Sequence, residues 1–113
     1  MKKFFINNHT WVIEEKPEKD ILEEYHKRSP NAYACFGLTF YKEHKIWIAK
    51  ELCNDEQIRT LKHELTHCYI WEYGFYNVDF NNEEVVCDIV AGIYDFMNYV
   101  LNIGSEKDER IDL

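Results

Sequence analysis

The segment His63-Glu64-Leu65-Thr66-His67 contains the side chains best suited to chemistry in this sequence. Two histidines four residues apart lie on the same face of a helix, one turn above the other. Such a pair can bind Zn²⁺ through two imidazole nitrogens, and the intervening glutamate can act as a general base toward water. The segment therefore predicts a zinc site with His63 and His67 as ligands and Glu64 as the base. The alternative is an ordinary helix with solvated side chains at these positions.

A catalytic zinc site also needs a third protein ligand and an open position. No histidine follows His67 in the sequence, so a downstream carboxylate is the natural candidate. Three acidic residues open the last predicted helix: Glu83, Glu84 and Asp88. The three upstream histidines are interpreted as surface or partly packed side chains: His9, His26 and His44.

The residues around the motif predict a helix over 55–73. Asn54 and Gln57 fit an N-cap with its capping box, and Gly74 fits the position just after a helix end. Apolar residues recur at three- and four-residue spacing, which indicates a face directed at the core: Ile58, Leu61, Leu65, Cys68 and Tyr69.

The rest of the chain alternates between strand and helix patterns. The first residues predict two short strands, or one interrupted strand, around Asn7-Asn8. A helix is expected after Pro17, over 20–28. Strands are expected within 33–41 and over 46–49, as an antiparallel hairpin, and a last helix over about 83–103. Gly37 lies inside the first strand of that hairpin, where it indicates a bulge or a close backbone approach.

These elements predict one α+β domain over residues 1–113, with about 105–113 as a frayed tail. A small antiparallel sheet is expected to pack against the motif helix and the last helix. The net charge of −8 argues against direct nucleic-acid binding. No apolar run suits a membrane span and no secretory signal is visible, so a cytoplasmic protein is expected. The four cysteines form no C-x-x-C pair and are expected to be small buried hydrophobic residues.

Two segments resemble the ImmA/IrrE-type zincin-like metallopeptidases. Residues 60–67 are similar to the first motif of that family, and residues 84–91 resemble the E-x-x-A-[DN]-x-x-A segment that follows it. The resemblance covers roughly 33–100, including the strand that ends at Ile46-Trp47-Ile48. It implies that Glu84 is the third ligand and that Asp88 hydrogen-bonds a ligating histidine.

Some residues within this resemblance have alternative interpretations. Glu84 can instead belong to a capping box with Asn81. Glu83 is the less favoured candidate for the third ligand, and its alternative interpretation is a solvated first-turn carboxylate. Cys87 stands where the family has alanine, which is a change of one small residue for another. A thiolate near the metal is the less favoured interpretation of that cysteine.

The resemblance implies a zinc-dependent endopeptidase of phage or mobile-element origin, acting on a protein or peptide such as a repressor-like regulator. The sequence shows no appended DNA-binding domain. Strand 46–49 is expected to pair with an extended substrate. Three tyrosines are candidates for polarising the substrate carbonyl: Tyr69, Tyr73 and Tyr76. A metal-binding interaction module without catalysis and a structural domain without metal are the two alternatives.

Overall fold

The computed structural model describes residues 2–75 and 81–103. These residues form an α+β fold of four strands and three helices, in the order β1 (Lys2–Ile6), β2 (His9–Lys16), α1 (Glu18–Tyr25), β3 (Gly37–Phe40), β4 (Lys45–Ala49), α2 (Asn54–Glu72) and α3 (Glu83–Asn102). The expected frayed tail and Tyr76 lie outside the described residues. No described helix is long and apolar enough to cross a membrane.

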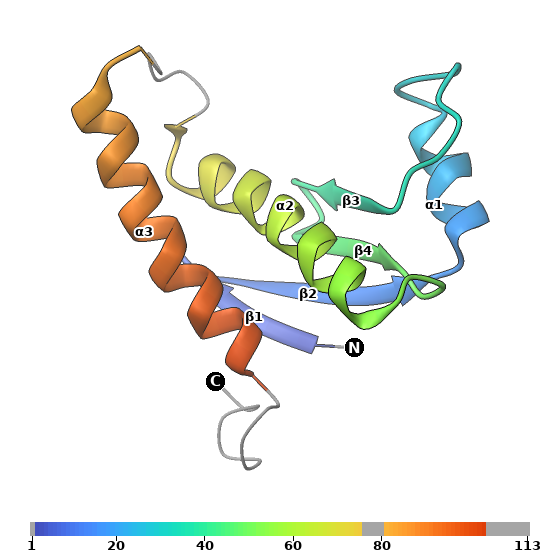
Figure 1. The fold of residues 1–113 in the computed structure, drawn as a ribbon, viewed down its shortest axis with the longest axis horizontal. Helices are drawn as coiled ribbons and strands as arrows, with labels where there is room; N and C mark the ends of the chain where they lie inside the picture. The colour runs from blue at the N-terminus through green and yellow to red at the C-terminus, as the bar shows by residue number, and fades with distance from the viewer. Residues whose placement is uncertain (1, 76–80, 104–113) are drawn as a thin grey trace.

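The four strands form one mixed sheet in the order β1-β2-β4-β3 (Figure 1). The pairs β1–β2 and β3–β4 are antiparallel, whereas β2 and β4 are parallel. The prediction of an antiparallel sheet is therefore wrong for the central pair. The reason is the connection between β2 and β4. The chain leaves β2, forms α1 and the edge strand β3, and then turns back as β4, which runs beside β2 in the same direction.

Two tight turns join the antiparallel strands. Asn7 and Asn8 have φ angles of 49° and 65°, the left-handed conformation that a two-residue hairpin turn requires. Residues 2–16 therefore form a hairpin and not one interrupted strand. His44 also has a positive φ, 55°, in the turn between β3 and β4.

The helices cover both faces of the sheet. In β4, Ile46 and Ile48 face α2 and α3, while Trp47 and Ala49 face α1, as the two-residue period of a strand requires. The larger core lies between the sheet and the two long helices, and its buried members include Phe4, Trp11, Leu65, Cys68, Phe96 and Val100.

Helix α2 lies close to its predicted bounds, but its first turn differs from the prediction. Cys53 is the N-cap residue, and Asn54 is already helical. The side chain of Gln57 donates to the carboxylate of Glu15 and to the carbonyl of Ala49, so the predicted capping box is wrong. At the other end Gly74 has a φ of 73°, which confirms the predicted stop.

The prediction that the four cysteines are buried holds only for Cys68. All four are free thiols. Only Cys68 is buried; Cys35 is half-buried, and Cys53 and Cys87 are exposed. Burial raises the pKa of the Cys68 thiol far above its usual range, so this side chain stays protonated and acts as an apolar core residue.

Candidate metal centre on helix α2

His63 and His67 stand together on the exposed side of α2. Their Nε2 atoms are 3.2 Å apart. Two nitrogen ligands of a tetrahedral zinc, each at about 2.0–2.1 Å, are separated by about 3.3 Å. The predicted pair therefore has a spacing that one zinc ion can bridge without moving the helix backbone.

Glu64 is buried where α2 faces β3, and it lines the same cavity as the two histidines. Only 7% of its surface is exposed, and its Oε1 atom accepts a hydrogen bond of 2.8 Å from the hydroxyl of Thr39 on β3. Burial of a carboxylate is unfavourable unless polar groups satisfy it, and the Thr39 hydroxyl does so here. The predicted general base is consequently fixed in position by a strand of the sheet.

Gly37 makes this contact between strand and helix possible. A Cβ atom at Gly37 would lie 2.7 Å from Cγ2 of Thr60 and 3.1 Å from Cγ of Glu64. The absence of a side chain lets β3 approach α2 closely enough for Thr39 to reach Glu64. The sequence-based expectation of a close backbone approach at Gly37 is confirmed.

We expect Gly37→Ala to destabilise the fold by about 1–3 kcal/mol, because the added methyl group overlaps a packed interface. Thermal unfolding of the purified variant measures this loss. In the double variant Gly37→Ala/Thr60→Ser the nearest clashing methyl group is gone, so part of the stability should return. An unchanged melting temperature in Gly37→Ala would contradict the close packing described here.

A cavity of about 340 Å³ opens beside the three motif side chains. Its other polar walls come from α1, the segment after it, β3 and the turn after β3, and they include Tyr25, Arg28, Cys35, Thr39 and Tyr41. Burial, with a smaller contribution from the Glu64 carboxylate, raises the pKa of Tyr41. Tyr41 therefore keeps its phenolic proton at neutral pH and can donate a hydrogen bond into the cavity.

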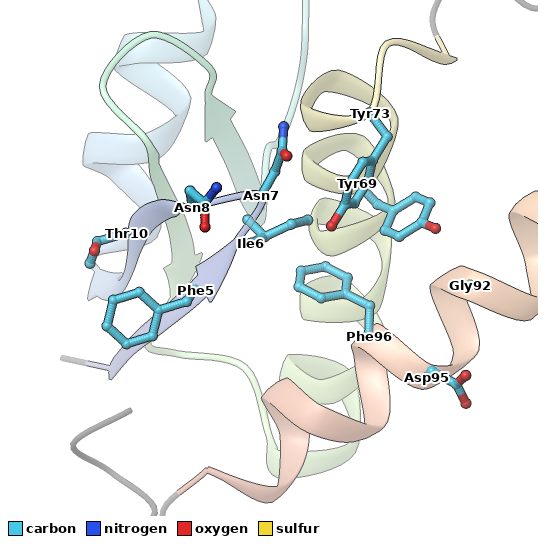
Figure 2. Close-up of a pocket in the computed structure, with 10 residues that line it drawn as sticks. All are labelled: Phe5, Ile6, Asn7, Asn8, Thr10, Tyr69, Tyr73, Gly92, Asp95 and Phe96. Carbon is cyan, nitrogen blue, oxygen red and sulfur yellow. The ribbon is translucent and has the colours of Figure 1, made fainter.

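Two of the three tyrosines expected to serve this site lie elsewhere. Tyr69 and Tyr73 line a different cavity of about 700 Å³, between the β1–β2 turn and α3 (Figure 2). Tyr69 packs so closely against Gly92 of α3 that a side chain at that position would collide with its hydroxyl. Tyr25 and Tyr41 line the cavity beside the histidine pair instead. Sequence reasoning missed them because they come from α1 and from the turn after β3, far from the motif.

The structure does not bring Glu84 to the two histidines. Glu84 and Asp88 are exposed on the first turns of α3, and in Figure 1 this helix begins beyond the end of α2. Asn82 is the N-cap, and its side chain accepts hydrogen bonds from the backbone N–H groups of Glu84 and Val85. The cap is therefore Asn82 and not the expected Asn81. Among the described residues, Glu84 belongs to no group of three side chains close enough to share a metal ion.

Among residues 2–75 and 81–103, one group of three metal-binding side chains lies close together, and it does not include the motif histidines. It consists of His9, His44 and Glu72, whose ligand atoms all lie within 4.8 Å of one another. The sequence predicts both histidines to be surface or partly packed residues, and no pattern in it marks Glu72 as a ligand. Its position was nevertheless a signal, because Glu72 continues the apolar spacing of Leu65 and Cys68 along the buried face of α2.

No family model, curated protein or solved structure matches this chain. The resemblance of its motifs to zincin-like metallopeptidases therefore stays a prediction. The functional assignment rests on the geometry of His63, Glu64 and His67 and on the cavity beside them.

Proposed function

We propose that this chain is a zinc-dependent endopeptidase whose metal is held by His63 and His67 and whose general base is Glu64. The observation that carries the proposal is the 3.2 Å spacing of the two Nε2 atoms next to a buried, oriented carboxylate. If the two histidines were only solvated side chains, the fixed orientation of the buried Glu64 carboxylate by the Thr39 hydroxyl would have no role. When bound, zinc would acidify a water molecule and polarise a substrate carbonyl.

Glu64 performs the proton transfers in this proposal. Its carboxylate removes a proton from the attacking water and later delivers that proton to the departing amine. The hydrogen bond from Thr39 occupies Oε1 and fixes the plane of the carboxylate. The protonated phenol of Tyr41 is positioned in the same cavity to donate a hydrogen bond to the carbonyl oxygen as negative charge develops on it.

Glu84 remains the proposed third ligand, with Asp88 as the hydrogen-bond acceptor of a ligating histidine. Both roles require the first turns of α3 to approach the histidines when metal binds. The exposure of these turns makes such a movement less costly than a rearrangement of the core, since the buried residues of α3 are Ile89, Phe96 and Val100. The missing third ligand is also the observation that favours the second candidate, a metal-binding interaction module without catalysis.

The peptide substrate is proposed to lie along β3. Strand β4, which the sequence favoured for this role, is flanked by β2 and β3 and has no free edge. Strand β3 is an edge strand, and the carbonyl oxygens of Gly37 and Thr39 accept hydrogen bonds from the side chains of Cys35 and Arg28, respectively. An extended peptide can replace these side chains as an added strand, which places its backbone beside the cavity.

The proposal is tested by adding the purified protein, with zinc or with a chelator, to a lysate and labelling newly formed protein N-termini. We expect N-termini that appear only in the zinc sample, because cleavage needs the metal. If zinc is bound and no protein is cut across a broad set of lysates, the interaction module becomes the better assignment.

A further inference from the structure

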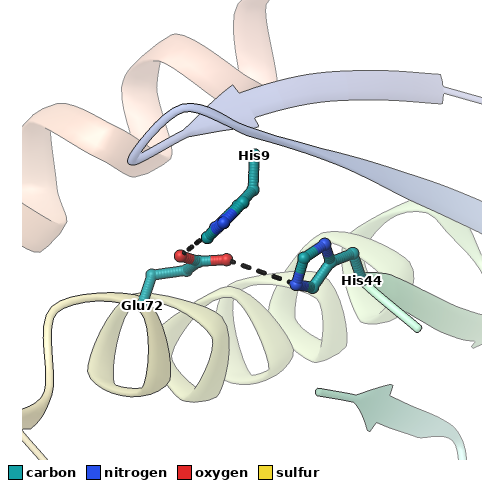
Figure 3. A group of neighbouring side chains, drawn as sticks. All are labelled: His9, His44 and Glu72. Atoms are coloured by element: carbon teal, nitrogen blue, oxygen red, sulfur yellow. Dashed lines mark hydrogen bonds and ion pairs between the residues drawn. The ribbon is translucent and has the colours of Figure 1, made fainter. Parts of the chain in front are cut away.

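His9, His44 and Glu72 converge at the C-terminal end of α2 from three separate segments (Figure 3). Nδ1 of His9 lies 2.7 Å from Oε1 of Glu72, and Nε2 of His44 lies 3.9 Å from Oε2 of the same carboxylate. His9 begins β2, His44 belongs to the turn between β3 and β4, and Glu72 ends α2. The three side chains therefore connect both hairpins to one helix.

Glu72 is an unusual residue for its position, because its side chain is 1% exposed and extends the apolar stripe of α2. The indole N–H of Trp11 donates a 2.6 Å hydrogen bond to Oε2. The amide of Asn7 donates to the backbone carbonyl of Glu72 over 2.9 Å. The carboxylate is thus fixed in orientation before any ligand arrives.

The two histidines are also oriented by their surroundings. The His44 ring stacks on the Trp11 ring with 5.1 Å between centroids, and its backbone is held at a φ of 55°. The His9 and His44 rings are 4.7 Å apart. Their side chains remain 48% and 31% exposed, respectively, so water or an ion can reach the space between them and Glu72.

This arrangement has the composition of a zinc site. Two imidazoles and one carboxylate are a ligand set that zinc accepts, with an open position for water. The hydrogen bond from Trp11 to the carboxylate is the kind of outer contact that orients a metal ligand. We propose that His9, His44 and Glu72 form a second zinc site, separate from the His63–His67 pair, which fixes the two hairpins to the end of α2.

The second site does not depend on peptidase activity. Glu72 follows His67 by five residues, or about 7.5 Å along the helix axis. Glu72 lies on the buried face of α2, whereas His67 lies on its exposed face. Zinc at this position would stabilise the folded state, because the three ligands come together only after folding.

The test uses the variant His63→Ala/His67→Ala, which removes the other pair. The metal-free protein is titrated with Zn²⁺ by calorimetry and with Co²⁺ by visible spectroscopy. We expect one equivalent of zinc, a cobalt spectrum typical of four-coordinate binding, and a higher melting temperature with zinc. Absence of zinc uptake at micromolar concentrations in this folded variant would overturn the proposal and leave the cluster as a hydrogen-bond network.

Two further substitutions locate the bound ion. His9→Ala removes a half-exposed side chain. His44→Asn removes the imidazole and introduces asparagine, which tolerates the left-handed backbone at this position. Each should weaken zinc binding by at least about tenfold, whereas the control His26→Ala should not. The His26 imidazole lies at the carbonyl of Ala32, away from the cluster. Equal zinc affinity in the His9→Ala and His26→Ala variants would show that zinc binds elsewhere.

Discussion

Replacing Glu64 by glutamine is expected to reduce peptide cleavage by about 10²- to 10⁴-fold, the usual contribution of a general acid–base residue. Glutamine keeps the shape of the side chain and an oxygen atom that can accept the hydrogen bond from Thr39. It has no basic carboxylate, so it cannot take a proton from the attacking water. The histidine pair is unchanged, so the zinc content and the melting temperature should stay close to those of the wild-type protein.

The measurement compares initial rates on a substrate found by N-terminal labelling, together with zinc content. Glu56→Gln is a matched control, because Glu56 is an exposed carboxylate in the first turn of the same helix. This control should cleave at the wild-type rate. If Glu64→Gln also cleaves at that rate, the mechanism proposed here is wrong.

The double substitution His63→Ala/His67→Ala is expected to remove one equivalent of zinc per chain and all cleavage. Both histidines are exposed on α2, so their removal takes away the ligands with little effect on the core. Zinc titration in competition with a coloured chelator measures the loss, and the remaining equivalent would be the ion at His9, His44 and Glu72. The control is His26→Ala, which should bind as much zinc as the wild-type protein. An unchanged zinc content in the double variant would place the metal elsewhere.

The same titration decides the third ligand. Glu84→Gln should weaken zinc binding much more than Glu83→Gln, the adjacent first-turn carboxylate. Asp88→Asn should have an intermediate effect, about 10- to 100-fold, as changes beside a metal ligand do. Equal effects at Glu83 and Glu84 would leave the assignment of Glu84 unsupported, and a larger effect at Glu83 would make Glu83 the ligand.

The sequence by itself determined the local elements of this protein. The spacing of apolar residues predicted α2 and α3 almost to their ends, because helical periodicity repeats every few residues and needs no distant partner. It also placed His63 and His67 on one face, which is a consequence of helix geometry alone. Gly37 and Gly74 were interpreted correctly, since a missing side chain and a positive φ leave recognisable positions in the sequence.

Only the tertiary structure decided what surrounds these elements. The parallel pairing of β2 with β4 depends on how the whole chain buries its apolar faces, and no local pattern encodes it. Thr39 meets Glu64 across 25 positions of sequence, and His9 meets Glu72 across 63. Such contacts form only when strands and helices pack together and bring the two side chains within hydrogen-bonding distance. The residue types alone therefore do not predict which side chains will meet.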